Sequence, residues 1–176
     1  MKLHLGCGNK KIPGFINIDS RQEVNPDLIE DVSSLESITS NSVELIYACH
    51  VLEHFNRFKY KEVLKRWFDV LQPNGILRIS VPDVEKVFEH YSKFKDLTVL
   101  KGFLWGGQTY NENFHYIGFD FKTLSNDLLE LGFKNVKKYD WRKTNHSMID
   151  DFSQAYLPHM DKENGLLMSL NIEAYK

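Results

Sequence analysis

Short apolar runs alternate with stretches of helical periodicity along this chain, and that alternation narrows the possible folds more than any other feature. Apolar runs of strand length separated by helical segments favour an α/β fold with a mainly parallel sheet. We expect seven strands, over Lys2–Leu5, Phe15–Ile18, Leu28–Asp31, Val43–Cys49, Gly75–Val81, Phe133–Trp141 and Leu166–Tyr175.

Three segments have the apolar spacing of amphipathic helices. The clearest is Phe58–Leu71, which Pro73 and Gly75 bring to an end. A second helix should begin after Asp83 as its N-cap, and a third should run over Phe121–Leu131 with Asp120 as its cap. We expect the apolar stripes of all three to pack in the core, including the face formed by Val84, Val87, Phe88 and Tyr91.

The composition limits both the architecture and the partners. At 176 residues and 42% hydrophobic content, the chain suits one domain over residues 1–176. A net charge of −2 gives no strong attraction to nucleic acid or to an anionic membrane. No apolar run approaches the roughly 18 residues of a membrane span, there is no leader pattern, and two cysteines make no disulfide framework. We therefore expect a cytoplasmic protein with no nucleic-acid partner and no stable membrane insertion; the sequence leaves its oligomeric state open.

Candidate ligand-binding residues follow three of the predicted strands. Gly6, Cys7 and Gly8 come directly after the first strand, where glycines let the backbone approach a ligand and leave amide groups free to bind it. Asp19 ends the second strand, the position of a carboxylate that accepts hydrogen bonds from ribose hydroxyls. Asp31, followed by Val32, ends the third strand and is placed to hold an adenine amino group.

These segments resemble the successive motifs of class I methyltransferases that use S-adenosyl-L-methionine (SAM). The matching segments are Leu5–Gly8, Phe15–Asp19, Asp31-Val32, Val43–Phe55 and Leu71–Pro82, the last of which is similar to the family's L-x-P-G-G turn. Further on, Trp105–Gln108, His115 and Asp150–Tyr156 resemble a compact bacterial subgroup associated with surface-polysaccharide synthesis.

The resemblance implies a Rossmann-like, mainly parallel seven-stranded sheet with an antiparallel last strand. It implies a cofactor half over about 1–82 and an acceptor half over about 83–176. It also implies S-adenosyl-L-methionine as the cofactor, with a binding site formed by Gly6, Cys7, Gly8, Asp19, Asp31, Val32 and His50.

The link between the first two strands departs from the usual pattern. Only residues 9–14 separate Gly8 from the second strand, whereas a parallel crossover with its helix needs about a dozen residues or more. We therefore expect the first crossover helix to be reduced to a turn or absent. Lys11 stands where a nicotinamide-binding G-x-G-x-x-G motif has its third glycine, which argues against a nicotinamide enzyme.

The run His50-Val51-Leu52-Glu53-His54 also matches the H-x-x-E-H pattern of zinc peptidases. Peptidase chemistry needs both histidines on one helical face, a third ligand and the glutamate as base. Here the pattern follows directly on a buried-looking strand, so we favour the methyltransferase interpretation and expect no metal.

The acceptor side is expected in the C-terminal half. A hydroxyl acceptor must lose its proton, and a histidine suits that role, which makes His115 and His146 the candidate general bases. The long polar segment 143–165 is predicted to contact the acceptor. The chain has neither the acidic cluster of metal-dependent hydroxyl methylation nor an Asn/Asp-Pro-Pro-Tyr motif, and this favours an oxygen acceptor.

The leading hypothesis is methylation of a sugar hydroxyl in a surface glycan or its precursor. Two alternatives stay open: methylation of another small metabolite or a lipid, and a non-catalytic SAM-binding module.

Overall fold

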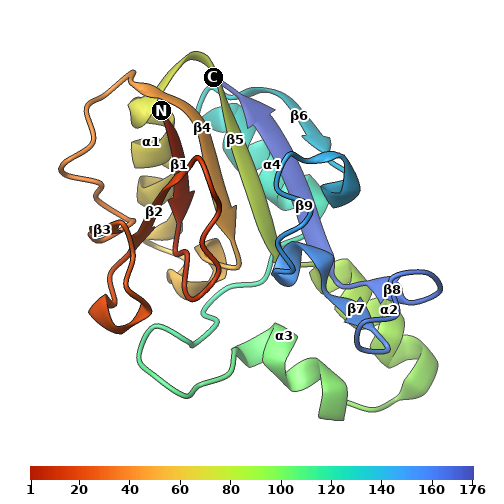
Figure 1. The fold of residues 1–176 in the computed structure, drawn as a ribbon. Helices are drawn as coiled ribbons and strands as arrows, with labels where there is room; N and C mark the ends of the chain where they lie inside the picture. Colours follow the sequence, from red (N-terminus) through yellow and green to blue (C-terminus); the bar gives the residue numbers. More distant parts are fainter.

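A computed structural model describes residues 1–176, and a seven-stranded sheet runs through its centre in the order β3-β2-β1-β4-β5-β9-β6 (Figure 1). The strands β3, β2, β1, β4 and β5 are parallel, while β9 lies antiparallel between β5 and β6. Their bounds are β1 Lys2–Leu5, β2 Ile16–Asp19, β3 Leu28–Ile29, β4 Val43–Cys49, β5 Leu71–Pro82, β6 Lys134–Lys138 and β9 Ser169–Tyr175. The predicted mainly parallel sheet with an antiparallel last strand is confirmed.

Most differences from the predicted strands lie at their ends. The last predicted strand is two elements, because Met168 leaves the ladder and its backbone N–H donates to the carbonyl of Ala155. The residues before it, β8 (Leu166–Leu167), pair instead with β7 (Tyr156–Leu157) in a separate two-stranded sheet. β5 begins earlier than expected, at Leu71, directly after the preceding helix.

The hydrophobic core lies on one face of the sheet. Helices α1 (Tyr60–Val70) and α4 (Phe121–Glu130) cover that face (Figure 1). Alternate strand residues point toward them, because successive side chains of a strand face opposite sides. A cluster of 27 buried apolar residues results, with Trp67 fully buried and its indole N–H bonded to the carbonyl of Val32.

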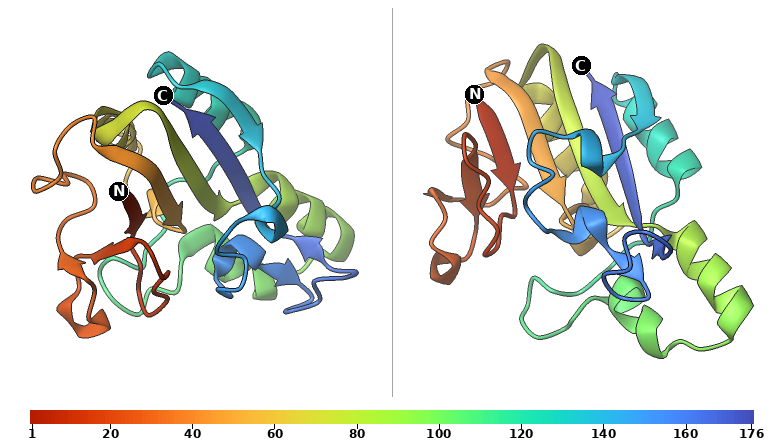
Figure 2. Two further views of the ribbon diagram at one scale, coloured as in Figure 1. Left: turned by 45° about the horizontal axis from the view of Figure 1, so that its top comes forward. Right: turned by 45° about the vertical axis from the view of Figure 1, so that its right-hand side comes forward.

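Helix α2 (Val84–Phe94) begins as predicted, with the Asp83 side chain accepting a hydrogen bond from the N–H of Glu85. The expectation that its apolar face packs in the core is wrong. Only Val87 is buried, whereas Phe88 and Tyr91 are exposed. α2 extends past the carboxyl edge of the sheet (Figure 2), where Val87 joins a small separate cluster with Leu100 and Met168.

The opposite face of the sheet is polar and carries no helix from the first crossover. Residues 6–15 form turns between β1 and β2, so the predicted loss of that helix is confirmed. Segment 139–155 crosses this face in front of β5 and β9 (Figure 1). The hydroxyl of Tyr47 in β4 donates to Asp151 at 2.7 Å, and Arg78 in β5 pairs with Glu173 in β9 at 2.6 Å.

No helix of the structure has the length and apolar character needed to cross a membrane.

Candidate active site

Two neighbouring cavities open at the carboxyl edge of the parallel strands, where ligands bind in open α/β sheets. The small cavity, of about 320 Å³, is lined from β1 to β4 and by the loop that contains Tyr110. The large cavity, of about 880 Å³, lies between the β1–β2 turn, α3 (Lys101–Trp105) and segment 150–160. Five residues line both cavities: Gly6, Arg21, His50, His54 and Tyr110. The two cavities therefore adjoin.

The glycines after β1 have the conformations their position requires. Gly6 has φ +62°, and a Cβ there would lie 2.5 Å from Val51 Cγ2, so no other residue fits. Gly8, with φ +50°, donates its backbone N–H to Asp19 Oδ2 at 2.8 Å. Gly6 lines both cavities and Gly8 lines the large one, as the motif predicts for a ligand-binding turn.

Asp19 is 5% exposed and lines the small cavity. Its Oδ1 accepts from the backbone N–H and Nε of Arg21, and its Oδ2 accepts from Gly8. A carboxylate oxygen accepts about two hydrogen bonds, so Oδ2 keeps one position for a ligand. Arg21, whose guanidinium lies 4.4 Å from the ring centre of Tyr110, was not predicted as a site residue. Arg21 follows the strand by two residues, which was an available signal; Tyr110 offered none.

Asp31 and Val32 also line the small cavity. Asp31 is exposed and its Oδ1 caps the turn by accepting from the N–H of Ser33 at 2.8 Å. Val32 is buried in the main core. These two residues thus give the cavity one carboxylate and one apolar side chain.

Both cysteines line the large cavity as free thiols. Burial raises the pKa of Cys7 to about 11 and holds the pKa of Cys49 well above its ordinary value. Both are therefore protonated near neutral pH, which makes them poor nucleophiles.

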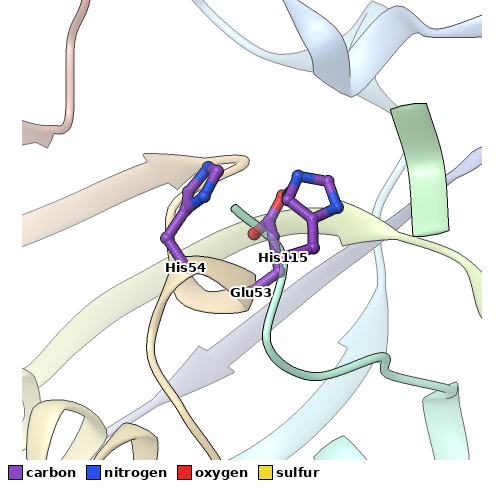
Figure 3. A group of neighbouring side chains, drawn as sticks. All are labelled: Glu53, His54 and His115. Atoms are coloured by element: carbon purple, nitrogen blue, oxygen red, sulfur yellow. Dashed lines mark ion pairs between the residues drawn. The ribbon is translucent and has the colours of Figure 1, made fainter. Parts of the chain in front are cut away.

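A buried carboxylate and three imidazoles meet beneath the junction of the two cavities. Glu53, 1% exposed, comes from the 3-10 helix η2 (Leu52–His54), and its carboxylate lies next to the rings of His54 and His115, which contact each other edge-to-face (Figure 3). The Tyr116 N–H donates to the Glu53 carbonyl, and this bond ties the loop of His115 to η2. His50 Nδ1 lies 3.3 Å from Glu53 Oε1, and His115 Nε2 lies 3.9 Å from it.

Burial shifts the titration of this cluster toward its neutral forms. It raises the pKa of Glu53 to about 8 and lowers the pKa of His50 to about 3, the latter with help from His115 and His54. The pKa values of His54 and His115 are also lowered by burial. The imidazoles are therefore neutral at physiological pH and carry lone pairs.

His50 directly follows the last residue of β4 and has φ +52°, and only one short 3-10 helix comes after it. The H-x-x-E-H pattern therefore does not sit on the long helix that a zinc peptidase uses to present two histidines from one face. This arrangement speaks against the peptidase interpretation.

His146 does not lie at either cavity. It is 5% exposed and packs on the polar face of the sheet, with its ring centre 4.2 Å from that of Tyr47 and its Nε2 3.4 Å from Arg78 Nη1. The structure gives it no access to a cofactor or an acceptor, so it does not support the expected catalytic role. Of the two candidate bases, only His115 lines a cavity.

Segment 143–165 is packed against the sheet, and part of it forms the wall of the large cavity. Some of the polar groups expected to meet the acceptor are used internally. Asp151 caps η5 (Phe152–Gln154) through Ser153 and accepts from Tyr47. Gln154 binds the carbonyls of Ser147 and Ile149 and the ammonium of Lys162. Phe152, Tyr156 and His159 line the cavity as well, and the Phe152 side chain is largely exposed there.

Comparisons with known proteins agree with this geometry. A family model described as a methyltransferase domain matches residues 12–79. The fold is similar to that of a SAM-dependent methyltransferase from Methanosarcina mazei, at 20% identity and a TM-score of 0.60 over 99% of this chain and 91% of that one. It is also similar to one from Archaeoglobus fulgidus, at 16% identity and a TM-score of 0.59 over 99% and 85%. A third, from Mesorhizobium loti, has 14% identity and a TM-score of 0.57 over 99% and 90%. No curated protein matches the sequence.

At these identities the solved structures establish the fold, and the family match adds the activity. Together they define the class of this protein: it is a SAM-dependent methyltransferase, and S-adenosylmethionine is its cofactor.

Proposed function

We propose that residues 1–176 form one methyltransferase domain that O-methylates a sugar hydroxyl of a surface glycan or of its precursor. The observation that carries the proposal is the large cavity, which adjoins the small one and is lined by both aromatic and hydrogen-bonding groups. A cavity of about 880 Å³ has room for a saccharide beside the methionine end of the cofactor.

The residues at the two cavities fit S-adenosylmethionine, which supplies an activated methyl group when bound. Asp19 keeps an acceptor position for a ribose hydroxyl, and Asp31 with Val32 suits the adenine. Gly6, Cys7, Gly8 and His50 would surround the methionine end at the junction. Tyr110, which comes from the acceptor half and is anchored by Arg21, would close the site over the cofactor.

The acceptor would lie against segment 150–160. Phe152 offers an exposed aromatic face for the apolar side of a sugar ring and packs against His50, with ring centres 5.1 Å apart. The His159 ring adds a hydrogen-bonding group on the same wall, whereas the Tyr156 hydroxyl accepts from the Trp141 indole N–H at 3.3 Å. Mixed polar and aromatic linings of this kind favour a hydroxylated acceptor that must be held in a fixed orientation.

His115 is the residue we assign to activation of the acceptor hydroxyl. Its Nδ1–H donates to the Phe103 carbonyl at 3.0 Å, so its Nε2 carries a lone pair beside the junction. In the simplest form of this role, His115 Nε2 takes the proton that the hydroxyl loses.

The proposal is tested by calorimetry with SAM, followed by methyl-transfer assays on a panel of nucleotide sugars, oligosaccharides, small phenols, amines and lipids. We expect SAM binding and turnover with one group of saccharides. Turnover on a non-saccharide alone would identify the small-metabolite or lipid alternative and overturn the glycan assignment. SAM binding without turnover on any acceptor would identify a non-catalytic binding module.

We also propose a cytoplasmic location without a nucleic-acid partner. Two free thiols, Cys7 and Cys49, suit a reducing compartment, and the net charge of −2 offers no basic surface excess. Labelling of both thiols in denaturant after lysis under non-reducing conditions, together with the absence of binding to duplex DNA at low salt, is the expected result.

A further inference from the structure

We propose that Glu53, His54 and His115 form a site for one divalent first-row transition-metal ion at the junction of the two cavities. Their ligand atoms all lie within 4.8 Å of one another, and the two rings are in edge-to-face contact next to the carboxylate, with their centres 4.9 Å apart (Figure 3). The inference rests on the proposed function and specifies how His115 would act in it. The sequence alone predicted no metal here.

The hydrogen bonds of His54 and His115 leave one ring nitrogen of each free to bind a metal ion. His54 Nδ1 lies 3.0 Å from the carbonyl oxygen of Phe114, and His115 Nδ1 lies 3.0 Å from that of Phe103. A carbonyl only accepts, so each Nδ1 carries the ring proton and each Nε2 carries the lone pair. A hydrogen bond from the second ring nitrogen to a carbonyl is also how metal-binding histidines are oriented.

His50 adds a third imidazole lone pair next to the same carboxylate. The Ser169 hydroxyl donates its proton to the Phe152 carbonyl, so it accepts from His50 Nε2 at 3.0 Å. The proton of His50 is therefore on Nε2, and its Nδ1 faces Glu53 Oε1 without a proton, at 3.3 Å.

Neither oxygen of Glu53 has a hydrogen-bond donor, although both atoms are buried. A buried polar group without a partner is costly, and the cost is greater for a carboxylate. When Glu53 is ionised, the site brings together a carboxylate and three imidazole nitrogens that all accept, so a bound cation would take the place of the proton that burial favours on Glu53. A bound cation satisfies this set of groups.

The ligand types indicate which cation fits. Two imidazole nitrogens and one carboxylate suit Zn²⁺, Mn²⁺ or Fe²⁺, whereas Mg²⁺ and Ca²⁺ prefer oxygen ligands throughout. Three protein ligands leave positions open on the ion. His54 and His115 line the large cavity, so an open position would be reachable from the acceptor side.

An acceptor hydroxyl bound to the ion would have a lowered pKa, as metal-bound water does. Its O–H bond would break, and the proton would pass to water in the open cavity, since His115 Nε2 is then occupied by the ion. His115 would act through the cation in this role.

The test uses the full chain without a polyhistidine tag, freed of metal with a chelator. The protein is titrated with MnCl₂ by electron paramagnetic resonance and with ZnCl₂ by calorimetry. We expect one ion per chain. Glu53→Gln and His115→Ala should each weaken binding by about 100-fold or more, because each removes a direct ligand. His159→Ala, which removes another histidine of the large cavity, should bind as the wild type does.

Circular dichroism and SAM calorimetry on every variant establish that it is folded. The absence of saturable binding to the wild type, or equal binding by all variants, would overturn the ion site. The methyltransferase proposal has a separate readout: failure of the wild type to bind SAM while it still binds Mn²⁺ would overturn that function and leave the ion site. Restoration of wild-type turnover by Mn²⁺ or Zn²⁺ after metal removal would support both.

Discussion

Single side chains at this site hold one another through hydrogen bonds and ring contacts. The Asp19 carboxylate is shared between the Gly8 amide and Arg21, and Arg21 in turn lies over the Tyr110 ring. Through Arg21, Asp19 thereby positions Tyr110, which lies 91 places further along the chain. Removing such a residue should affect both binding and preorganisation.

Asp19→Ala should weaken SAM binding by roughly 1.5–3 kcal/mol, the scale for hydrogen bonds to a charged group. The reason is that the free acceptor position on Oδ2 and the anchor of Arg21 are both lost. Calorimetry on the folded variant measures the effect. Glu23→Ala, an exposed acidic residue just beyond the same strand, is the control and should bind as the wild type. Wild-type affinity in Asp19→Ala would contradict the assignment.

Phe152→Ala should raise the KM for a saccharide acceptor about 10-fold, since an aromatic contact of this size contributes roughly 1–1.5 kcal/mol. SAM affinity should stay within about 0.5 kcal/mol of the wild-type value. Steady-state kinetics and calorimetry give the two values. Phe88→Ala removes a similarly exposed ring that lines neither cavity, and its kinetics should not change. An equal loss of SAM affinity in Phe152→Ala would place the ring on the cofactor instead.

The strands and helices differ in how far the sequence predicts their bounds and their packing. β4 was predicted at its observed bounds because seven residues of strand character are followed by a break. The absent first crossover helix followed from a count of residues. The packing of α2 did not follow, because Phe88 and Tyr91 have helical spacing whether or not anything covers them.

The site residues likewise divide into those that a local sequence motif predicts and those whose place depends on tertiary contacts. Gly6, Gly8 and Asp19 were predicted because local motifs carry them. His146 was misplaced, since its position depends on the course of a segment that ends on the polar face of the sheet. Tyr110 and the partnership of Glu53 with His115 depend on contacts over about 60 residues or more, which a single sequence does not encode locally.

The hydrogen bond from Tyr47 to Asp151 is one of several that hold segment 139–155 to the sheet, together with those from Ser169 and Asn171. Tyr47→Phe removes the 2.7 Å hydrogen bond to Asp151 and should lower the free energy of unfolding by about 1–2 kcal/mol. Cleavage within residues 143–165 by a protease should also become faster. Urea unfolding and limited proteolysis test this, with the half-exposed Tyr91→Phe on α2 as the matched control. Unchanged proteolysis would show that other contacts hold the segment.

At the scale of the whole molecule, the polar face makes stability depend on pH. Burial lowers the pKa of His146 to about 4, and the nearby Arg78 acts in the same direction; Asp151 opposes the shift, and His4 supports it. In the unfolded chain the same histidine titrates near 6.5. The unfolded state therefore binds more protons between these two values, so stability falls as the pH drops from about 6.5 toward 4.

His146→Gln should flatten this dependence. Between pH 7 and pH 5 the wild type should lose about 2 kcal/mol more than the variant in its free energy of unfolding. Urea titrations at the two pH values provide the comparison, and His159→Gln, an exposed histidine, is the control. Equal losses in wild type and His146→Gln would show that His146 does not drive the pH dependence.

The missing first crossover helix has a consequence for how the chain reaches its fold during synthesis. The polar face of β4 and β5 is completed by partners far along the chain: Asp151 lies 104 residues after Tyr47, and Glu173 lies 95 residues after Arg78. A ribosome makes the chain from the N-terminus, so these partners emerge when the earlier strands have long been available. A nascent chain that stops before β9 lacks Glu173, the partner of Arg78. It also lacks the antiparallel strand that pairs with β5. We therefore expect the domain to fold cooperatively and only late in synthesis, at a rate limited by the closure of these long loops.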